Sequence, residues 1–264
     1  SMISYYKNKF LINDSININE NIFNGIGIFE TIRFYNKKLL FLNEHIDRLL
    51  SNDIFNFKNL NKKELARNIL EVINHNNLID GLVKVIFIPI DNSWENFEYY
   101  IFERELPLIN EDIVKIIFLA EHKYPILRFN PLYKSLFYAG NLLAIRDAQK
   151  QGAFEPILYN KESIITEGAM RNIFFIKKDI IHTPSIDLGI LEGITRRYII
   201  NIAQTLGYKV DHSHIDYSII DNMDEAFITS TGIGILPCKW NNWTSEFKIT
   251  LKLQNIYNEM IKTE

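Results

Sequence analysis

The feature of this chain that most constrains its fold is a series of short apolar segments with strand character, interrupted by only a few helical patterns. In the first 120 residues such segments fall at 10–13, 27–36, 82–90, 98–103 and 113–120, and they are bounded by polar and turn residues. Apolar residues at helical spacing occur at 43–53 and 61–76. Because strands and helices are partly segregated, the pattern predicts an α+β unit.

A proline-containing segment, "EHKYPILRFNP" at 121–131, interrupts this periodicity. Two prolines in a short stretch are typical of a turn or linker. We therefore expect a small N-terminal α+β domain at 1–120, an interdomain linker at 121–131 and a larger C-terminal domain at 132–264.

The expected second domain also mixes strands and helices. Glycines at 152 and 207 are expected to end two of its helices. The expected helices fall at 140–152, 193–207 and 250–261, and the expected strands at 155–160, 163–168, 172–179, 179–184, 208–215 and 225–231. The sequence has no internal repeat or low-complexity run.

Composition and charge exclude several classes of protein. The 264 residues carry a formal net charge of -3, and no segment concentrates Lys and Arg as a nucleic-acid-binding surface would. The longest apolar stretch, 82–90, is too short to span a membrane and contains Lys84. The N-terminus lacks the features of a signal peptide, and the single cysteine rules out an internal disulfide framework. We therefore expect a cytoplasmic protein with no nucleic-acid or membrane partner.

Three segments are candidates for binding an anion. In "GILEGITRRYII", Gly193 directly precedes an amphipathic helix, whose first N–H groups and dipole favour phosphate, and Thr195 adds a hydroxyl group. In "FITSTGIGILP", Thr231 follows a strand and precedes a glycine that allows close approach of a ligand. In "NEHIDRLL", Arg48 offers a fork of donors. Plain loop-to-helix junctions are commoner than phosphate sites, so the first segment alone decides nothing.

Two further residues are candidates for a chemical role. Lys134 lies between apolar and aromatic residues in "LYKSLFYAGN", where a lysine stem covering apolar surface is the ordinary interpretation. Glu167 ends a predicted strand in "SIITEGAMRNIFFI", and a carboxylate beside an apolar strand needs a partner. Pyridoxal phosphate chemistry requires a lysine, an acid for the ring nitrogen and a phosphate cradle. Lys134, Glu167 and the turn at 193–195 match these three requirements in that order.

The ordered set of these segments resembles a known family. The stretches are "GIGIFETIRFYNKKLLFLNEHIDRLL", "YKSL" with "NLLAIRDAQKQGAFEPILYN", "ITEGAMRNIFFIKKDIIHTP", "GILEGITR" and "DEAFITSTGIGILP". Together, over about residues 20 to 240, they resemble the class IV aminotransferases, also called the fold-type IV pyridoxal phosphate enzymes. The resemblance implies a two-domain fold with the cofactor, pyridoxal 5'-phosphate, between the domains, and a homodimer.

The same resemblance assigns roles to individual residues. It implies that Lys134 forms the Schiff base and then acts as the base and acid that moves the substrate's α-proton. It implies that Glu167 keeps the pyridine nitrogen protonated, that Leu191 packs on the ring face, and that Tyr138 bonds the ring oxygen. The phosphate cradle implied by the resemblance consists of Arg48, Gly193, Ile194, Thr195 and Thr231.

The chain departs from the family where relatives bind a substrate carboxylate. Many relatives have a glycine- and arginine-rich loop there, and the segment 86–100 contains no arginine. Arg33 and Arg171 are the candidate substrate-binding replacements, and a structural role competes for each. His45 matches a family position with a supporting role. His212 and His214 share a face of a predicted strand, but no further ligands accompany them, so no metal site is predicted.

Three functions remain open on the sequence. The leading hypothesis is a pyridoxal phosphate aminotransferase that acts on a small amino acid. The first alternative is 4-amino-4-deoxychorismate lyase, which uses the same lysine to form 4-aminobenzoate and pyruvate for folate synthesis. The second is a family member that keeps the fold but performs no catalysis. The presence of Lys134 and Glu167 argues against this alternative.

Overall fold

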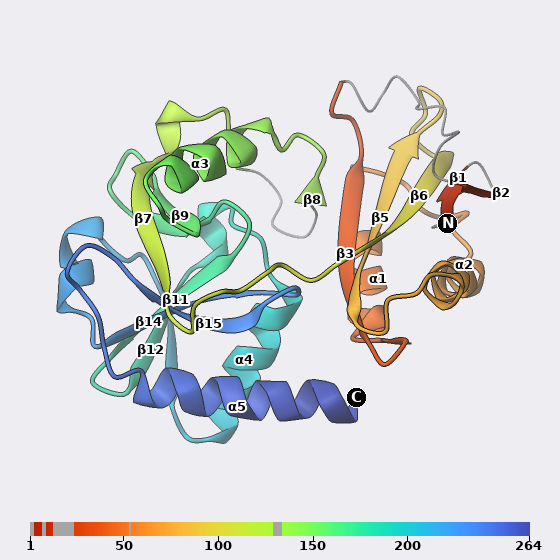
Figure 1. Ribbon diagram of the computed structural model, residues 1–264. Helices are drawn as coiled ribbons and strands as arrows, with labels where there is room; N and C mark the ends of the chain where they lie inside the picture. Colours follow the sequence, from red (N-terminus) through yellow and green to blue (C-terminus); the bar gives the residue numbers. More distant parts are fainter. Residues whose placement is uncertain (1–2, 7–8, 13–23, 53, 129–133) are drawn as a thin grey trace. The chain divides into compact units, whose positions relative to one another are not determined.

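The computed structural model describes residues 3–6, 9–12, 24–52, 54–128 and 134–264 (Figure 1). Among these residues the chain forms two compact units. The first unit comprises the described residues up to 107 together with 134–137, and the second comprises 108–128 and 138–264. Each unit combines a β-sheet with helices (Figure 1), so the α+β architecture expected from the sequence is confirmed.

The first unit is built on a sheet whose described strands follow the order β2-β1-β6-β5-β3-β4, with β8 added beside β3. The strands are β1 (Ile3–Tyr6), β2 (Lys9–Ile12), β3 (Ile28–Tyr35), β4 (Lys38–Leu39), β5 (Gly81–Pro89), β6 (Phe97–Arg104) and β8 (Lys134–Ser135). Two helices, α1 (Leu42–Leu50) and α2 (Lys62–His75), cover one face of this sheet (Figure 1).

Alternation along β3 and β5 gives the sheet two different faces, because successive strand residues point to opposite sides. Ile28 and Ile32 of β3 pack with Val83 and Val85 of β5 and with the apolar sides of the helices. The intervening position on β3, Glu30, belongs to the same helix-covered face and is buried. The opposite face therefore carries the odd-numbered residues of β3, beginning with Phe29.

The second unit contains a larger sheet, whose described strands follow the order β10-β9-β7-β15-β14-β11-β12-β13. The strands are β7 (Val114–Ala120), β9 (Glu155–Tyr159), β10 (Ile165–Gly168), β11 (Asn172–Lys177), β12 (Ile180–Pro184), β13 (Lys209–Ser213), β14 (Glu225–Ser230) and β15 (Gly234–Lys239). The helices are α3 (Ala139–Lys150), α4 (Ile194–Thr205) and α5 (Lys248–Thr263). Short 3-10 helices lie at Glu121–Lys123, Ile186–Leu188 and Tyr217–Asn222.

The division into units differs from the domain boundaries expected from the sequence. Strand β7 pairs in parallel with β9 and β15, so it belongs to the second sheet and not to the first. The described part of the expected linker, 121–128, lies in the second unit as well. Strand β8 returns to the first sheet and pairs with β3. These pairings join residues far apart in the chain, which local periodicity does not report. Asn13 of the first expected strand and the end of the expected linker, 129–131, lie outside the described residues.

No helix among the described residues is long and apolar enough to cross a membrane. The cytoplasmic location stays a prediction.

Candidate active site

Lys134 is positioned by its pairing with β3. Its partner in the antiparallel register is Phe29, so both side chains project from the face that α1 and α2 do not cover. The Nζ atom of Lys134 lies 5.2 Å from the centroid of the Phe29 ring. A second lysine, Lys84 of β5, reaches the same ring, with Nζ 4.0 Å from the centroid. Burial, then the charges of Arg104 and Lys134, lowers the pKa of Lys84 to about 8.

Arg48 is buried beneath the opposite face of the first sheet. Its Nε donates to Oε1 of Glu30 at 2.8 Å, and its Nη2 donates to Oε2 at 2.6 Å. Burial opposes ionisation of Glu30, but the charge of Arg48 and the hydrogen bonds from His45 and Arg48 hold its pKa at about 2. Burial also lowers the pKa of His45, so a neutral ring donates through Nδ1 to Glu30 at 2.8 Å. The phosphate role that the family resemblance implies for Arg48 remains a proposal.

Glu167 lies in β10 of the second unit, where three donors from separate segments converge on its carboxylate. A guanidinium nitrogen of Arg128 donates to Oε1. The side-chain amide of Asn172 and the backbone N–H of Leu191 each donate to Oε2 at 3.2 Å. Because hydrogen bonds and an opposite charge stabilise the ionised form of a carboxyl group, this arrangement keeps Glu167 as an acceptor.

Arg128 is itself fixed by a second carboxylate. Its Nε and Nη2 donate to the two oxygens of Glu121, at 3.0 and 2.7 Å. The hydroxyl group of Thr166, next to Glu167 in the chain, also donates to Glu121 at 2.9 Å. A bidentate pair of this kind fixes orientation as well as charge. Arg128 therefore bridges two acids and presents one nitrogen to Glu167.

The N-terminus of α4 lies close to this carboxylate in the same unit. Gly193 is the N-cap residue and contributes no side-chain cap, so no side chain at this position occupies the first N–H groups of the helix. A Cβ atom at Gly193 would lie 2.3 Å from Oδ1 of Asn172. Asn172 also donates to the carbonyl oxygen of Leu191 at 3.0 Å. One side chain thus connects the loop before α4 to Glu167.

The remaining cradle residues of the second unit are Ile194, Thr195 and Thr231. Ile194 and Thr195 form the first turn of α4, and both are buried. Thr231 is in the turn between β14 and β15. Thr229, two residues earlier, is the register partner of Asn172, and its buried hydroxyl oxygen has no hydrogen-bond partner among the described residues. Strand pairing therefore brings the end of β14 toward the segment that contacts the start of α4.

Tyr138 precedes α3 and belongs to the second unit. Its hydroxyl group donates to the carbonyl oxygen of Ala169 at 3.1 Å, and the side chain of Asn141 donates to the same oxygen at 2.6 Å. Burial, followed by the charges of Glu155 and Glu167, raises the pKa of Tyr138. The hydroxyl group therefore stays protonated and serves as a donor at neutral pH.

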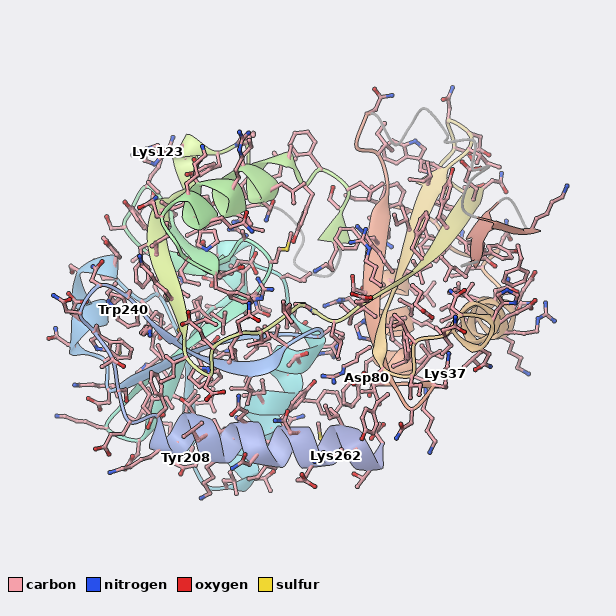
Figure 2. The ribbon with its side chains drawn as sticks, in the orientation of Figure 1. Lys37, Asp80, Lys123, Tyr208, Trp240 and Lys262 are labelled. Carbon is pink, nitrogen blue, oxygen red and sulfur yellow. The ribbon has the colours of Figure 1, made fainter. Side chains whose placement is uncertain are left out.

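The two arginines proposed as substrate ligands are both held in ion pairs. Nη2 of Arg33 lies 3.2 Å from Oδ2 of Asp80, which is labelled in Figure 2. Arg171 pairs with the fully buried Glu155 and lies over the ring of Phe154 at 4.5 Å. These contacts favour the structural alternative for both residues.

The two histidines considered for a metal have separate partners. His212 Nδ1 lies 3.1 Å from a guanidinium nitrogen of Arg196, and His214 pairs with Asp187 at 2.9 Å. Within the part of the chain that the structure describes, no cluster of three or more His, Cys, Asp or Glu side chains is arranged to hold a metal ion.

Sequence reasoning missed several residues that contact candidate residues within one or the other unit. The missed residues are Glu30, Lys84, Glu121, Arg128 and Asn172. Glu30 and Lys84 were detectable in principle, because each is a charged residue at an apolar position of an alternating strand. Arg128 and Glu121 fall in a segment interpreted as a linker, whose local pattern contains no signal for their contact with Glu167.

Comparison with known proteins gives the family. Residues 27–240 match the model of the family described as "Amino-transferase class IV". A protein of Methanocaldococcus jannaschii, provisionally named a branched-chain-amino-acid aminotransferase, is 31% identical over 81% of this chain and 77% of its own length. The aminodeoxychorismate lyase of Bacillus subtilis is 28% identical over 90% of this chain and 86% of its own. A D-alanine aminotransferase of Listeria monocytogenes is 31% identical over 81% and 77%.

A solved structure gives the same result for the fold. The branched-chain aminotransferase of Thermoproteus uzoniensis superposes with a TM-score of 0.86 and 23% identity, over 98% of this chain and 94% of the other. The fold is therefore that of the fold-type IV pyridoxal phosphate enzymes. The chain belongs to the class IV aminotransferase family.

The residues present fit this cofactor. The N-terminus of α4 is capped by Gly193 and has no side-chain cap, and Asn172 packs against this glycine. A helix start of this kind suits a phosphate group. The carboxylate of Glu167 is fixed by hydrogen bonds from Arg128, Asn172 and a backbone N–H group, which suits it as a partner for a protonated ring nitrogen.

Proposed function

We propose that this protein is an aminotransferase that acts on a small amino acid and binds pyridoxal 5'-phosphate covalently through Lys134. The observation that carries the proposal is the carboxylate of Glu167, which three donors fix beside the glycine-capped start of α4. A carboxylate held in this way suits a cationic ring nitrogen, and the helix start suits a phosphate group.

The cofactor, when bound, supplies an electron sink for the α-carbon of the substrate. The chain's own residues perform the remaining tasks. Glu167 would hold the ring nitrogen in its protonated form, and Leu191 would cover the ring. The N–H groups of Ile194 and Thr195, with Arg48 and Thr231, would hold the phosphate group. The Nζ atom of Lys134 takes the α-proton and returns it.

The names of the relatives limit the choice of substrate. They include an enzyme for D-alanine and a protein provisionally assigned to branched-chain amino acids, at similar identity. A small amino acid is common to both, and neither the D nor the L configuration is favoured. The lyase alternative stays open because the B. subtilis lyase matches over a larger share of this chain, 90%, than the other two. We also propose a homodimer, which light scattering on the purified chain would test.

The test of the activity is a visible absorbance spectrum of the chain supplied with pyridoxal phosphate, recorded before and after exposure to a panel of L- and D-amino acids. For an aminotransferase we expect a visible band that one amino acid removes in a single turnover with release of its keto acid. A band that all amino acids leave unchanged, but that aminodeoxychorismate converts with release of pyruvate, would replace the proposal with the lyase.

The role of Lys134 has a separate test. Borohydride reduction of the chain with bound pyridoxal phosphate, followed by peptide mapping, should place the label on Lys134. The Lys134→Ala variant should lose the visible band while it remains folded. Label on Lys84, which shares the ring of Phe29, would contradict the assignment.

A further inference from the structure

Two lysines converge on one aromatic ring in the first unit. Lys134 is the proposed Schiff-base lysine, and no role has been assigned to Lys84. Lys84 reaches the Phe29 ring from β5, and Lys134 reaches it from β8. The two Nζ atoms cannot be further apart than their two centroid distances together. At that separation two partly buried charges interact, because burial weakens the screening by salt.

Strand register makes this meeting a property of the sheet. Phe29 is paired with Lys134, and Thr31, the next residue on that face, is paired with Lys84. β3 therefore carries β8 on one edge and β5 on the other, and the two lysines project from the same face on either side of it. A flexible surface lysine would have no such constraint.

We propose that Lys84 is a positioning residue for Lys134. The ammonium group of Lys84 favours the neutral amine form of Lys134 at the pH of the reaction. The inference rests on the proposed role of Lys134, since a lysine must be neutral to attack an aldehyde or accept a proton. A neighbouring cation disfavours the charged form of an amine. The interaction is reciprocal, and the lowered pKa of Lys84 agrees with it.

Several other charged groups lie on the elements around β3 and β8. They are Glu30 and Arg33 on β3, Lys38 on β4, Glu44, His45, Asp47 and Arg48 on α1, Lys84 on β5, and Glu98, Glu103 and Arg104 on β6. The charge of Lys134 also acts on His45, where it contributes to the lowered pKa after burial and the charge of Arg48. Glu30 is engaged by Arg48 and His45, Arg33 pairs with Asp80, and Glu98 accepts a bond from Tyr100. The charge of Arg104 acts on Lys84. Of these groups, Lys84 is the one that shares a ring with Lys134.

The test is the titration of Lys134 in the full chain without added cofactor. Trace labelling with acetic anhydride across pH, followed by peptide mapping, reports the neutral fraction of each lysine. In Lys84→Met, which keeps the unbranched stem but not the charge, we expect Lys134 to label about three- to tenfold more slowly near pH 7, where Lys84 with its pKa of about 8 is still mostly charged. Lys84→Arg should keep the wild-type titration. Lys63→Met, which removes an exposed charge from α2, is the matched control and should change nothing.

A structural role for Lys84 predicts a different result. If Lys84 only packs on Phe29, Lys84→Met would leave the titration of Lys134 unchanged, and the proposal would be wrong. Lys84→Gln serves as a second neutral variant if Lys84→Met does not fold. The rate at which borohydride traps pyridoxal phosphate should also shift to higher pH in the neutral variants. Because the acetylation needs no cofactor, it separates the influence of Lys84 from the assignment of Lys134.

Discussion

At the scale of single residues, Glu30, Glu155 and Glu167 differ in the partners of their carboxylates. Glu30 is paired with Arg48 and a neutral His45, and its pKa is about 2. Glu155 is fully buried against Arg171, and burial raises its pKa. Glu167 receives donors from three segments. Of these three arrangements, the last lies beside a helix start capped by glycine, which is why the cofactor assignment rests on Glu167.

The bridge made by Arg128 leads to a prediction. Arg128→Met leaves the carboxylates of Glu121 and Glu167 without their shared cation, and we expect pyridoxal phosphate to bind about tenfold or more weakly. Glu121→Gln should cost less, because Arg128 still faces Glu167. Adding Glu121→Gln to Arg128→Met should recover part of the affinity, because it removes one of the two uncompensated acids.

Spectrophotometric titration of the three variants with pyridoxal phosphate checks this order. Equal affinities for wild type and Arg128→Met would show that Arg128 does not act on the cofactor site. Simple additivity in the double variant would show that the two side chains act independently.

At the scale of elements, the start of α4, where we propose that N–H groups bind an anion, also packs against Asn172. The φ and ψ angles of Gly193, -64° and 138°, are open to any residue. Glycine is required here for space and not for backbone freedom, since a Cβ atom would lie 2.3 Å from Oδ1 of Asn172.

Gly193→Ala should therefore displace Asn172 and weaken pyridoxal phosphate binding about tenfold, in line with the about 1–3 kcal/mol cost of overpacking. Gly152→Ala is the matched control. Its φ is +68°, and no described atom lies within 4 Å of the place that a methyl group would take. Alanine at this position should lower stability by roughly 1 kcal/mol without affecting the cofactor. Titration and thermal unfolding of both variants measure the two effects. Unchanged affinity in Gly193→Ala would argue against a cradle at this helix.

The sequence predicted most elements, because their periodicity is local, and missed those that depend on distant partners. Both α4 and β10, the strand that contains Glu167, show clear patterns. β15 was missed because it contains Pro237 and begins with a glycine, which are typical of loops, yet it lies between β14 and β7 in the sheet. β8 has only two residues and exists through its pairing with β3. The contact of Arg128 with Glu167 spans 39 residues, a separation that no local pattern encodes.

At the scale of the whole molecule, the two units respond differently to acid. The folded pKa of Glu30 lies below its value in an unfolded chain, so its contribution to stability is present above about pH 4.5 and is lost as pH falls toward 2. The lowered pKa of His45 acts in the same direction, starting below about pH 6.5. In the second unit the pKa of Glu155 is raised, so acid relieves the cost of its buried charge.

Acid should therefore destabilise the first unit before the second, with Glu30 alone accounting for about 3 kcal/mol between pH 5 and pH 2.

Trp94 belongs to the first unit, whereas Trp240, labelled in Figure 2, stacks on Trp243 in the second. In a Trp94→Phe chain, tryptophan fluorescence reports only the second unit, and circular dichroism reports both. In urea at about pH 3.5, the loss of circular dichroism should begin at a lower urea concentration than the fluorescence change. Glu30→Gln should lower stability at pH 7, because Arg48 loses the charged carboxylate of Glu30. It should also reduce the acid-induced difference between the urea concentrations at which the two signals change. Coincident transitions at both pH values would show that the two units unfold as one.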